Sequence, residues 1–127
     1  MELRETPLAA RHLSLGARLV PFSGWNMPVQ YSGIVEEHKA VRERAGLFDV
    51  SHMGRFVVRG PEAMADLENL TSNRVAKLVV GQFQYSSLPN DRGGLTDDIL
   101  VGRTGETEYQ VVVNAGNLGV DRDQIKA

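Results

Sequence analysis

The sequence predicts an α+β fold in which an antiparallel sheet is flanked by helices on one side. Apolar residues recur every three or four positions in several segments, which is typical of helices with one buried face. Other short segments alternate apolar and polar residues between turn residues, which is typical of antiparallel strands. With 127 residues, of which 42% are hydrophobic, the chain can bury the core of one ordinary domain.

The amino-terminal part is expected to hold a helix followed by an irregular loop. The helix begins at Thr6, whose hydroxyl can accept hydrogen bonds from free N–H groups, and Gly16 is a typical residue to end it. One face of this helix would hold Leu8, His12 and Leu15. Residues 20–31 show neither the helical nor the strand period of apolar residues, and they mix Pro and Gly with large side chains. They are therefore expected to form a loop. The residues expected to anchor this loop on the core are Phe22, Trp25 and Met27.

A second helix is expected over residues 33–45, with Ser32 as its N-cap and Gly46 as its end. Glu36 and Glu37 lie in its first turn, where the helix dipole favours acids. The residues of its inward face are Ile34, His38, Val41 and Ala45.

The rest of the chain is expected to hold four strands and two helices. The strands are expected over residues 55–59, 82–86, 95–101 and 109–113, with turns at 90–94 and 102–106. A helix that opens at Gly60-Pro61 has the apolar stripe Met64, Leu67 and Leu70.

The last helix, from residue 114 to the end, has only a weak apolar stripe, formed by Leu118 and Ile125 with Asp121 between them. No later segment could pack against this stripe. The chain is therefore expected to be the leading part of a longer product. The alternative is a natural short protein with a frayed end.

Composition excludes several classes of function. The net charge is −2 and the basic residues are scattered, so no nucleic-acid surface is expected. The absence of cysteine excludes disulfides, thiolate catalysis and cysteine-ligated metals. No apolar run approaches the ~18 residues of a membrane span. The two acids among the first five residues fit neither a signal peptide nor a mitochondrial transit peptide. We therefore expect a cytoplasmic protein without membrane or nucleic-acid partners.

Two adjacent acids, Asp97 and Asp98, follow the turn Gly93-Gly94 at the opening of a strand. Successive strand side chains point to opposite faces, so one acid can be buried while the other stays in solvent. A carboxylate that faces a pocket can bind a substrate nitrogen or act as an acid or base. The alternative is that both are ordinary turn residues, because Asp is common beside hairpin turns.

Three other patterns are weaker. Asp49, Ser51 and His52 have the side-chain types of a catalytic triad, but adjacent strand residues point apart and no nucleophile elbow is present. His52 is instead expected to be a structural, hydrogen-bonding residue. The three histidines are too scattered for a metal site, so none is expected. Gly93-Gly94 lacks the ending of a phosphate-binding loop.

Seven segments together carry a more specific signal than any single motif. They are Thr6-Pro7-Leu8, Leu15-Gly16-Ala17, Phe22-Ser23-Gly24-Trp25-Asn26-Met27-Pro28, Glu36-Glu37-His38, Gly46-Leu47-Phe48-Asp49-Val50-Ser51-His52-Met53-Gly54, Gly93-Gly94-Leu95-Thr96-Asp97-Asp98 and Val112-Val113-Asn114-Ala115-Gly116-Asn117. In order and spacing these segments resemble the amino-terminal region of the aminomethyltransferase family, the T-protein of the glycine cleavage system. The resemblance implies that residues 1–127 are the amino-terminal part of a folate-binding region whose remainder is absent.

The resemblance implies a transfer reaction. Members of the family take an aminomethyl group from the lipoyl arm of the H-protein and pass the one-carbon unit to tetrahydrofolate, the co-substrate. Methylenetetrahydrofolate forms and ammonia is released. The implied partners are therefore the lipoyl-bearing H-protein and a small-molecule folate.

The resemblance also implies which residues act. Asp98 matches the family's functional acid, which binds a folate nitrogen and orients or activates it for attack, without a covalent enzyme intermediate. Tyr85 and Asn114 match folate-contacting positions, and Met53 matches an apolar contact to the folate. Asp97 carries no such role.

The sequence departs from the family pattern in two places. Gly102 stands where relatives often have Tyr, which removes an aromatic contact. Gly119-Val120 stand where relatives usually carry a charged pair. Other folate contacts of the family lie beyond residue 127, so the isolated chain is expected to be inactive. The alternative function is a non-catalytic folate-binding or iron–sulfur assembly module on the same scaffold.

Overall fold

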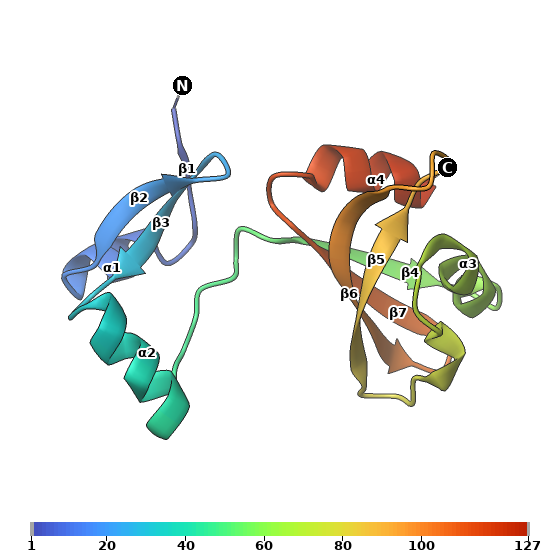
Figure 1. Cartoon of the computed structure of the whole chain (residues 1–127), viewed down its shortest axis with the longest axis horizontal. Helices are drawn as coiled ribbons and strands as arrows, with labels where there is room; N and C mark the ends of the chain where they lie inside the picture. The colour runs from blue at the N-terminus through green and yellow to red at the C-terminus, as the bar shows by residue number, and fades with distance from the viewer. Residues whose placement is uncertain (1, 127) are drawn as a thin grey trace. The chain divides into compact units, whose positions relative to one another are not determined.

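Backbone hydrogen bonds form one three-stranded and one four-stranded sheet within residues 2–126, the part of the chain that the computed structural model describes. The two sheets belong to separate units, Met1–His52 and Met53–Ala127, and each unit carries its own helices (Figure 1). The α+β class and the antiparallel sheet with helices beside it are therefore confirmed.

The first unit contains a sheet of order β1-β3-β2 and two helices. Its elements are β1 (Arg4–Glu5), α1 (Ala9–Ser14), β2 (Arg18–Phe22), β3 (Trp25–Gln30) and α2 (Ile34–Glu43). Strand β1 is parallel to β3, and β2 is antiparallel to it. The first helix forms, and Gly16 follows it with a φ of 76°, but it begins at Ala9 with Leu8 and not Thr6 at the cap position. Of the expected face only His12 is buried, while Leu8 and Leu15 are exposed.

The prediction of a loop over residues 20–31 is wrong, because these residues form the β2–β3 hairpin. Ser23 and Gly24 connect the strands with φ values of 48° and 81°, and a turn with two positive φ angles matches the natural twist of a hairpin. Pro21 lies on an edge strand, and Pro28 lies beyond the short stretch in which β1 pairs with β3. Proline is tolerated at both places because no sheet hydrogen bond from its nitrogen is needed there.

Helix α2 forms where it was expected, but its cap and its inward face differ from expectation. Ser32 makes no cap. Instead the carboxylate of Glu37 accepts hydrogen bonds from the backbone N–H groups of Tyr31 at 2.7 Å and Gly33 at 3.0 Å. These bonds hold the pKa of Glu37 below its usual range. The expected inward face lines a hollow of about 480 Å³ beside β3, where Ile34 is still 60% exposed.

A buried polar cluster centred on Asp49 holds the first unit together. Oδ2 of Asp49 accepts hydrogen bonds from the hydroxyl of Thr6 at 2.7 Å and from Nε2 of His12 at 2.8 Å. Oδ1 accepts from the backbone N–H of Ser51 at 2.9 Å. The ring of His12 also reaches the Tyr31 hydroxyl through Nδ1 at 2.7 Å. Residues before α1, within α1 and after α2 thus meet at one carboxylate, and Tyr31 after β3 joins them through His12.

The second unit is built on a four-stranded antiparallel sheet of order β4-β7-β6-β5. Its elements are β4 (Gly54–Arg59), α3 (Ala63–Leu70), a 3-10 turn (Val75–Lys77), β5 (Phe83–Pro89), β6 (Leu95–Gly105), β7 (Glu108–Val113) and α4 (Leu118–Lys126). The turn expected at residues 90–94 is confirmed, with Gly93 at a φ of 78°. The turn expected at 102–106 is misplaced, because β6 continues through Gly105 and the reversal lies at Glu106-Thr107.

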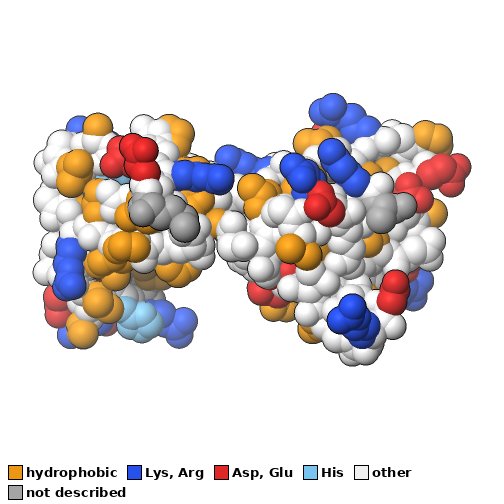
Figure 2. Space-filling model, turned by 90° about the horizontal axis from the view of Figure 1, so that it is seen from above, with side chains coloured by type: hydrophobic (Ala, Val, Ile, Leu, Met, Phe, Trp, Pro, Cys, Tyr) orange, Lys and Arg blue, Asp and Glu red, His pale blue; other side chains and the backbone are white. Residues whose placement is uncertain are grey.

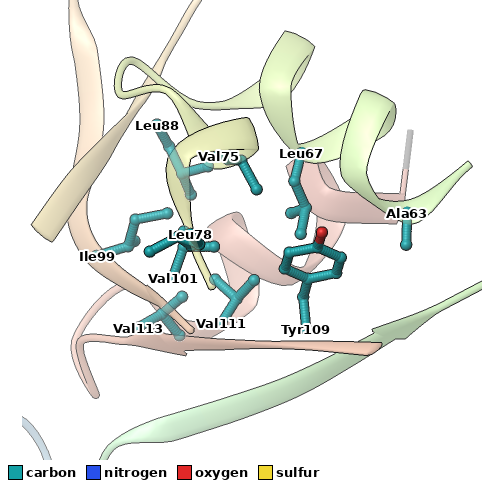
Figure 3. Close-up of a cluster of buried hydrophobic side chains, with 10 residues drawn as sticks. All are labelled: Ala63, Leu67, Val75, Leu78, Leu88, Ile99, Val101, Tyr109, Val111 and Val113. Carbon is teal, nitrogen blue, oxygen red and sulfur yellow. The ribbon is translucent and has the colours of Figure 1, made fainter. Parts of the chain in front are cut away.

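The hydrophobic core of this unit lies on one face of the four-stranded sheet (Figure 3). Its buried members are Ala63, Leu67, Val75, Leu78, Leu88, Ile99, Val101, Tyr109, Val111 and Val113. Leu70 of α3 and both Leu118 and Ile125 of α4 pack against this cluster. Both helices therefore cover the same face, as the sequence predicted, and the weak stripe of α4 is sufficient to hold it there.

Gly54 is the point of closest approach between β4 and α4. A Cβ at this position would lie 2.2 Å from Cδ1 of Leu118 and 2.8 Å from Cγ2 of Val113. Contacts this short are forbidden, so the packing of α4 requires a residue without a side chain at position 54.

We expect Gly54→Ala to lower the free energy of unfolding by about 1–3 kcal/mol, because the new methyl group must displace Leu118. The matched control is Gly119→Ala in α4, where an added Cβ meets nothing within 4 Å. That change should raise stability by about 0.5–1 kcal/mol, since alanine favours a helix. Urea unfolding followed by far-UV circular dichroism measures both; equal effects of the two changes would contradict the packing described.

The Asp49 cluster predicts acid sensitivity of the first unit. Burial alone would raise the pKa of Asp49, but the hydrogen bonds from Ser51, His12 and Thr6 outweigh it and hold this pKa well below its usual range. A carboxylate with a lowered pKa stabilises the fold at neutral pH, and the stabilisation is lost progressively as the pH falls below about 4.

Asp49→Ala should therefore lower stability at pH 7 by about 2–3 kcal/mol, because three buried donors lose their acceptor. The difference from the native chain should shrink as the pH falls. Trp25, the single tryptophan, reports on this unit by fluorescence. The control Glu36→Gln removes only an exposed pair with Lys39 and should change stability by less than about 0.5 kcal/mol. A pH-independent loss in Asp49→Ala would contradict the role given to the carboxylate.

Candidate functional site

Four residues singled out from the sequence lie in a row across the four-stranded sheet. Gly54 pairs with Val113, so the preceding Met53 reaches the position beside Asn114. The pairing of Leu100 with Val112 brings Asp98 next to Asn114, and the pairing of Ser87 with Asp98 brings β5 alongside. Tyr85 lies two residues before Ser87 on β5, so its side chain is on the same face of the sheet as that of Asp98. The row therefore runs from β4 through β7 and β6 to β5.

The side-chain amide of Asn114 ties this row together. Its Nδ2 donates to Oδ1 of Asp98 at 3.1 Å and to the backbone carbonyl of Asp98 at 3.0 Å. The same nitrogen lies 3.0 Å from Oδ1 of Asp97, whose other oxygen accepts from the backbone N–H of Asn114 at 3.2 Å. One asparagine thus contacts both adjacent acids.

The two acids point to opposite sides of β6, as the strand period predicted. Asp97 is half-buried on the side where α4 packs, and its pKa is lowered: burial would raise it, but hydrogen bonds that include those from Asn114 outweigh burial. Asp98 is exposed on the other face. A ligand that approaches this open face meets Asp98 and not Asp97.

Tyr85 lies beside Asp98 on the open face and is 64% exposed. Its pKa is raised by partial burial and then by the nearby charge of Asp98. The phenol therefore stays protonated at neutral pH and can donate a hydrogen bond. Together, Tyr85 and Asp98 offer a ligand one donor and one carboxylate acceptor.

The open face also carries apolar surface. Leu100, between the pairing positions of Tyr85 and Val112, is 39% exposed. Phe83 covers Gly102, where an added Cβ would lie 2.3 Å from Cε1 of its ring. The aromatic surface expected to be lost at Gly102 is thus partly supplied by the opposite strand. A flat ring system could lie on such a face and reach the polar row at its end.

The other sequence candidates do not assemble into a site. Asp49 is occupied by the buried cluster described above, and His52 is not one of its partners. The ring of His52 packs edge-on against Phe22 with 5.8 Å between ring centroids. Its Nδ1 is buried and meets no hydrogen-bond partner within residues 2–126, so the hydrogen bond expected there is not formed. The buried, hydrogen-bonded histidine is His12, which the sequence placed only on a helix face.

Neither a metal cluster nor a membrane span is found in the described residues. No group of three or more His, Asp or Glu side chains within residues 2–126 could hold a metal ion. No helix in the same part of the chain is long and apolar enough to cross a membrane. On the face seen in Figure 2, acidic and basic side chains are interspersed, without a continuous basic surface.

Known sequences and structures point to one family for this chain. The "Aminomethyltransferase" of Deinococcus deserti is 60% identical over 119 residues, which cover 94% of this chain and 33% of the relative. The protein of the same name from Thermus thermophilus is 55% identical over 125 residues, which cover 98% of this chain and 36% of the relative. The chain thus spans about a third of the length of these curated relatives.

A solved structure leads to the same result. The crystal structure of glycine cleavage system aminomethyltransferase T from Bartonella henselae superposes with a TM-score of 0.90 and 39% sequence identity. The match covers 98% of this chain and 35% of that protein. The family model described as "GCVT N-terminal domain" matches residues 8–127. This chain therefore belongs to the GCVT N-terminal domain family.

Proposed function

We propose that the chain forms the folate-facing sheet of an aminomethyltransferase of the glycine cleavage system. In this proposal the complete enzyme passes the one-carbon unit from the aminomethyl-lipoyl arm of the H-protein to tetrahydrofolate and releases ammonia. The observation that carries the proposal is the row of Met53, Asn114, Asp98 and Tyr85 on the open face of the sheet. Family membership supports the reaction class. A cytoplasmic location is proposed with it.

Three residues of the row, Asp98, Tyr85 and Met53, have chemical tasks that fit their positions. The carboxylate of Asp98 accepts a hydrogen bond from a folate nitrogen and places that nitrogen for attack. Its negative charge also stabilises the positive charge that develops on an attacking nitrogen. Tyr85 donates from its hydroxyl, and Met53 supplies a polarisable apolar contact. No covalent bond between the chain and the substrate is required.

The second candidate is a non-catalytic folate-binding or iron–sulfur assembly module. Such a module would need the open face and its apolar surface but would not need a carboxylate at Asp98. The outcome at Asp98 therefore distinguishes the two candidates.

We expect Asp98→Ala to reduce ammonia release, dependent on H-protein and tetrahydrofolate, by about 100-fold or more, because attack then loses both positioning and charge stabilisation. The assay uses the product of the complete reading frame that contains this sequence. Asp91→Asn, an exposed acid in the turn before β6, is the control and should keep full activity. Absence of ammonia release from the native protein, or full activity in Asp98→Ala, would refute the proposal.

The 127-residue chain alone is expected to show no turnover. Tyr85 is 64% exposed and Leu100 39% exposed, so the sheet face is open to solvent, and transfer chemistry requires a site from which water is excluded. The measurement is ammonia release by the purified chain with H-protein and tetrahydrofolate. Turnover by the monomer would show that this face is sufficient.

A further inference from the structure

Asp121 is the one fully buried acid within residues 2–126, and the proposed chemistry does not use it. It lies in the first turn of α4, where its backbone N–H donates to the carbonyl of Asn117 at 2.9 Å. Neither of its carboxyl oxygens accepts a hydrogen bond from a donor in the described residues. A buried carboxylate without a donor is strongly disfavoured, so a group in this position keeps its proton.

The carboxyl group whose charge acts on Asp121 is that of Asp97 on β6. Asn117, which accepts the backbone N–H of Asp121, donates its side-chain amide to the carbonyl of Thr96 at 3.4 Å, so the start of α4 lies beside this acid. A hydrogen bond between two carboxyl groups exists only when one of them is protonated. Asp97 already accepts from the side chain and the backbone N–H of Asn114, and these bonds favour its charged form. A proton shared by the two carboxyl groups would therefore reside on Asp121 and be donated to Asp97.

The titration of the two acids agrees with this arrangement. Burial, followed by the hydrogen bond to Asp97 and the charge of Asp97, raises the pKa of Asp121 to about 7. Burial would also raise the pKa of Asp97, but hydrogen bonds, with those from Asn114 foremost, lower it instead. The pair thus holds one proton and one negative charge below about pH 7.

Asp97 in turn determines how Asn114 faces the candidate site. Carboxylate and carbonyl oxygens only accept hydrogen bonds, so Asn114 must turn its amide nitrogen toward Asp97 and Asp98. The amide oxygen is then the group left to accept a hydrogen bond from a ligand. A change in Asp97 would release this orientation.

We propose that Asp121 is a positioning residue of the candidate site: its carboxyl donates a hydrogen bond to Asp97, and Asp97 fixes the amide of Asn114 beside Asp98. The proposal rests on the proposed function, in which Asn114 and Asp98 contact the folate. When Asp121 loses its proton, two negative charges face each other and Asp97 moves away. The amide of Asn114 then loses one of its acceptors, and folate binding weakens.

Other charged groups near α4 do not meet Asp121. Asp98 points to the opposite face of β6. Arg122 and Asp123 form an exposed ion pair at 3.0 Å on the outer side of α4. Asp66 of α3 and Lys126 line a separate cavity with Ile125, at the far end of the helix. Tyr85 on β5 lies beside Asp98. Asp97 is therefore the partner whose charge controls Asp121.

The test compares two substitutions of Asp121 in the product of the complete reading frame. Asp121→Asn keeps a donor toward Asp97 at every pH, so the KM for tetrahydrofolate should stay near the native value and lose its pH dependence. Asp121→Ala removes the donor and should raise this KM about tenfold while kcat changes by less than about threefold. In the native enzyme the KM should rise between pH 6 and 8, around the titration of Asp121 near pH 7.

The control is Asp123→Asn, which lies two residues further along α4 with its side chain 70% exposed. It should leave the KM and its pH profile unchanged. An unchanged KM in Asp121→Ala would overturn the proposal. So would an Asp121→Asn enzyme that keeps the native pH dependence, and this second criterion holds even if the alanine variant does not fold.

A measurement without activity separates this proposal from the proposed function. In the 127-residue chain, the side-chain amide signal of Asn114 in ¹H–¹⁵N NMR should shift with a midpoint near pH 7, and the shift should be absent in Asp121→Asn. If the native enzyme releases no ammonia but the shift is seen, the reaction is wrong and the coupling stands. If ammonia is released but Asn114 does not respond to pH, the positioning role is wrong.

Discussion

The alternation of side chains along β6 is the constraint on which the second unit depends. It sends Ile99 and Val101 into the core and leaves Asp98 and Leu100 on the open face. A slip of one residue in the pairing with β7 would bury Asp98 and expose the apolar residues. The register is therefore held by core packing, and the positions of the acids follow from it. Asn114 contacts both acids because it ends the neighbouring strand at the same level.

The sequence predicted the elements whose signal is local. The residues that make up each strand period, or the turn at Gly93-Gly94, lie within a few positions of one another in the sequence. Such signals can therefore be recognised without knowledge of the fold. The β2–β3 hairpin was missed because its strands contain proline and its turn places Ser23 at a positive φ, which composition does not reveal. The N-cap of α2 was missed because the acceptor is Glu37, inside the helix, and not Ser32 before it.

The candidate site was predictable only in part. Strand alternation showed that the side chains of Asp97 and Asp98 point to opposite faces of the sheet. The choice of Asp98 as the ligand-binding acid came from the family resemblance. Asp121 was placed on the apolar stripe of the last helix, and its position between Leu118 and Ile125 was a sign of burial. Its proposed pairing with Asp97, like the observed hydrogen bond between Thr6 and Asp49, joins residues far apart in the sequence. Such contacts follow from tertiary packing and leave no local pattern.

The pairing of β4 also has a consequence for how the second unit is assembled. The β5–β6 and β6–β7 pairs are joined by short turns, whereas β4 pairs with β7 across all the intervening elements, as Gly54 facing Val113 shows. Closing that long interval costs chain entropy that the hairpins avoid. During synthesis β4 leaves the ribosome well before β7, its partner in the sheet, has been made. We therefore expect the meander of β5, β6 and β7 to form first, and the docking of β4 to bring Met53 into the row last.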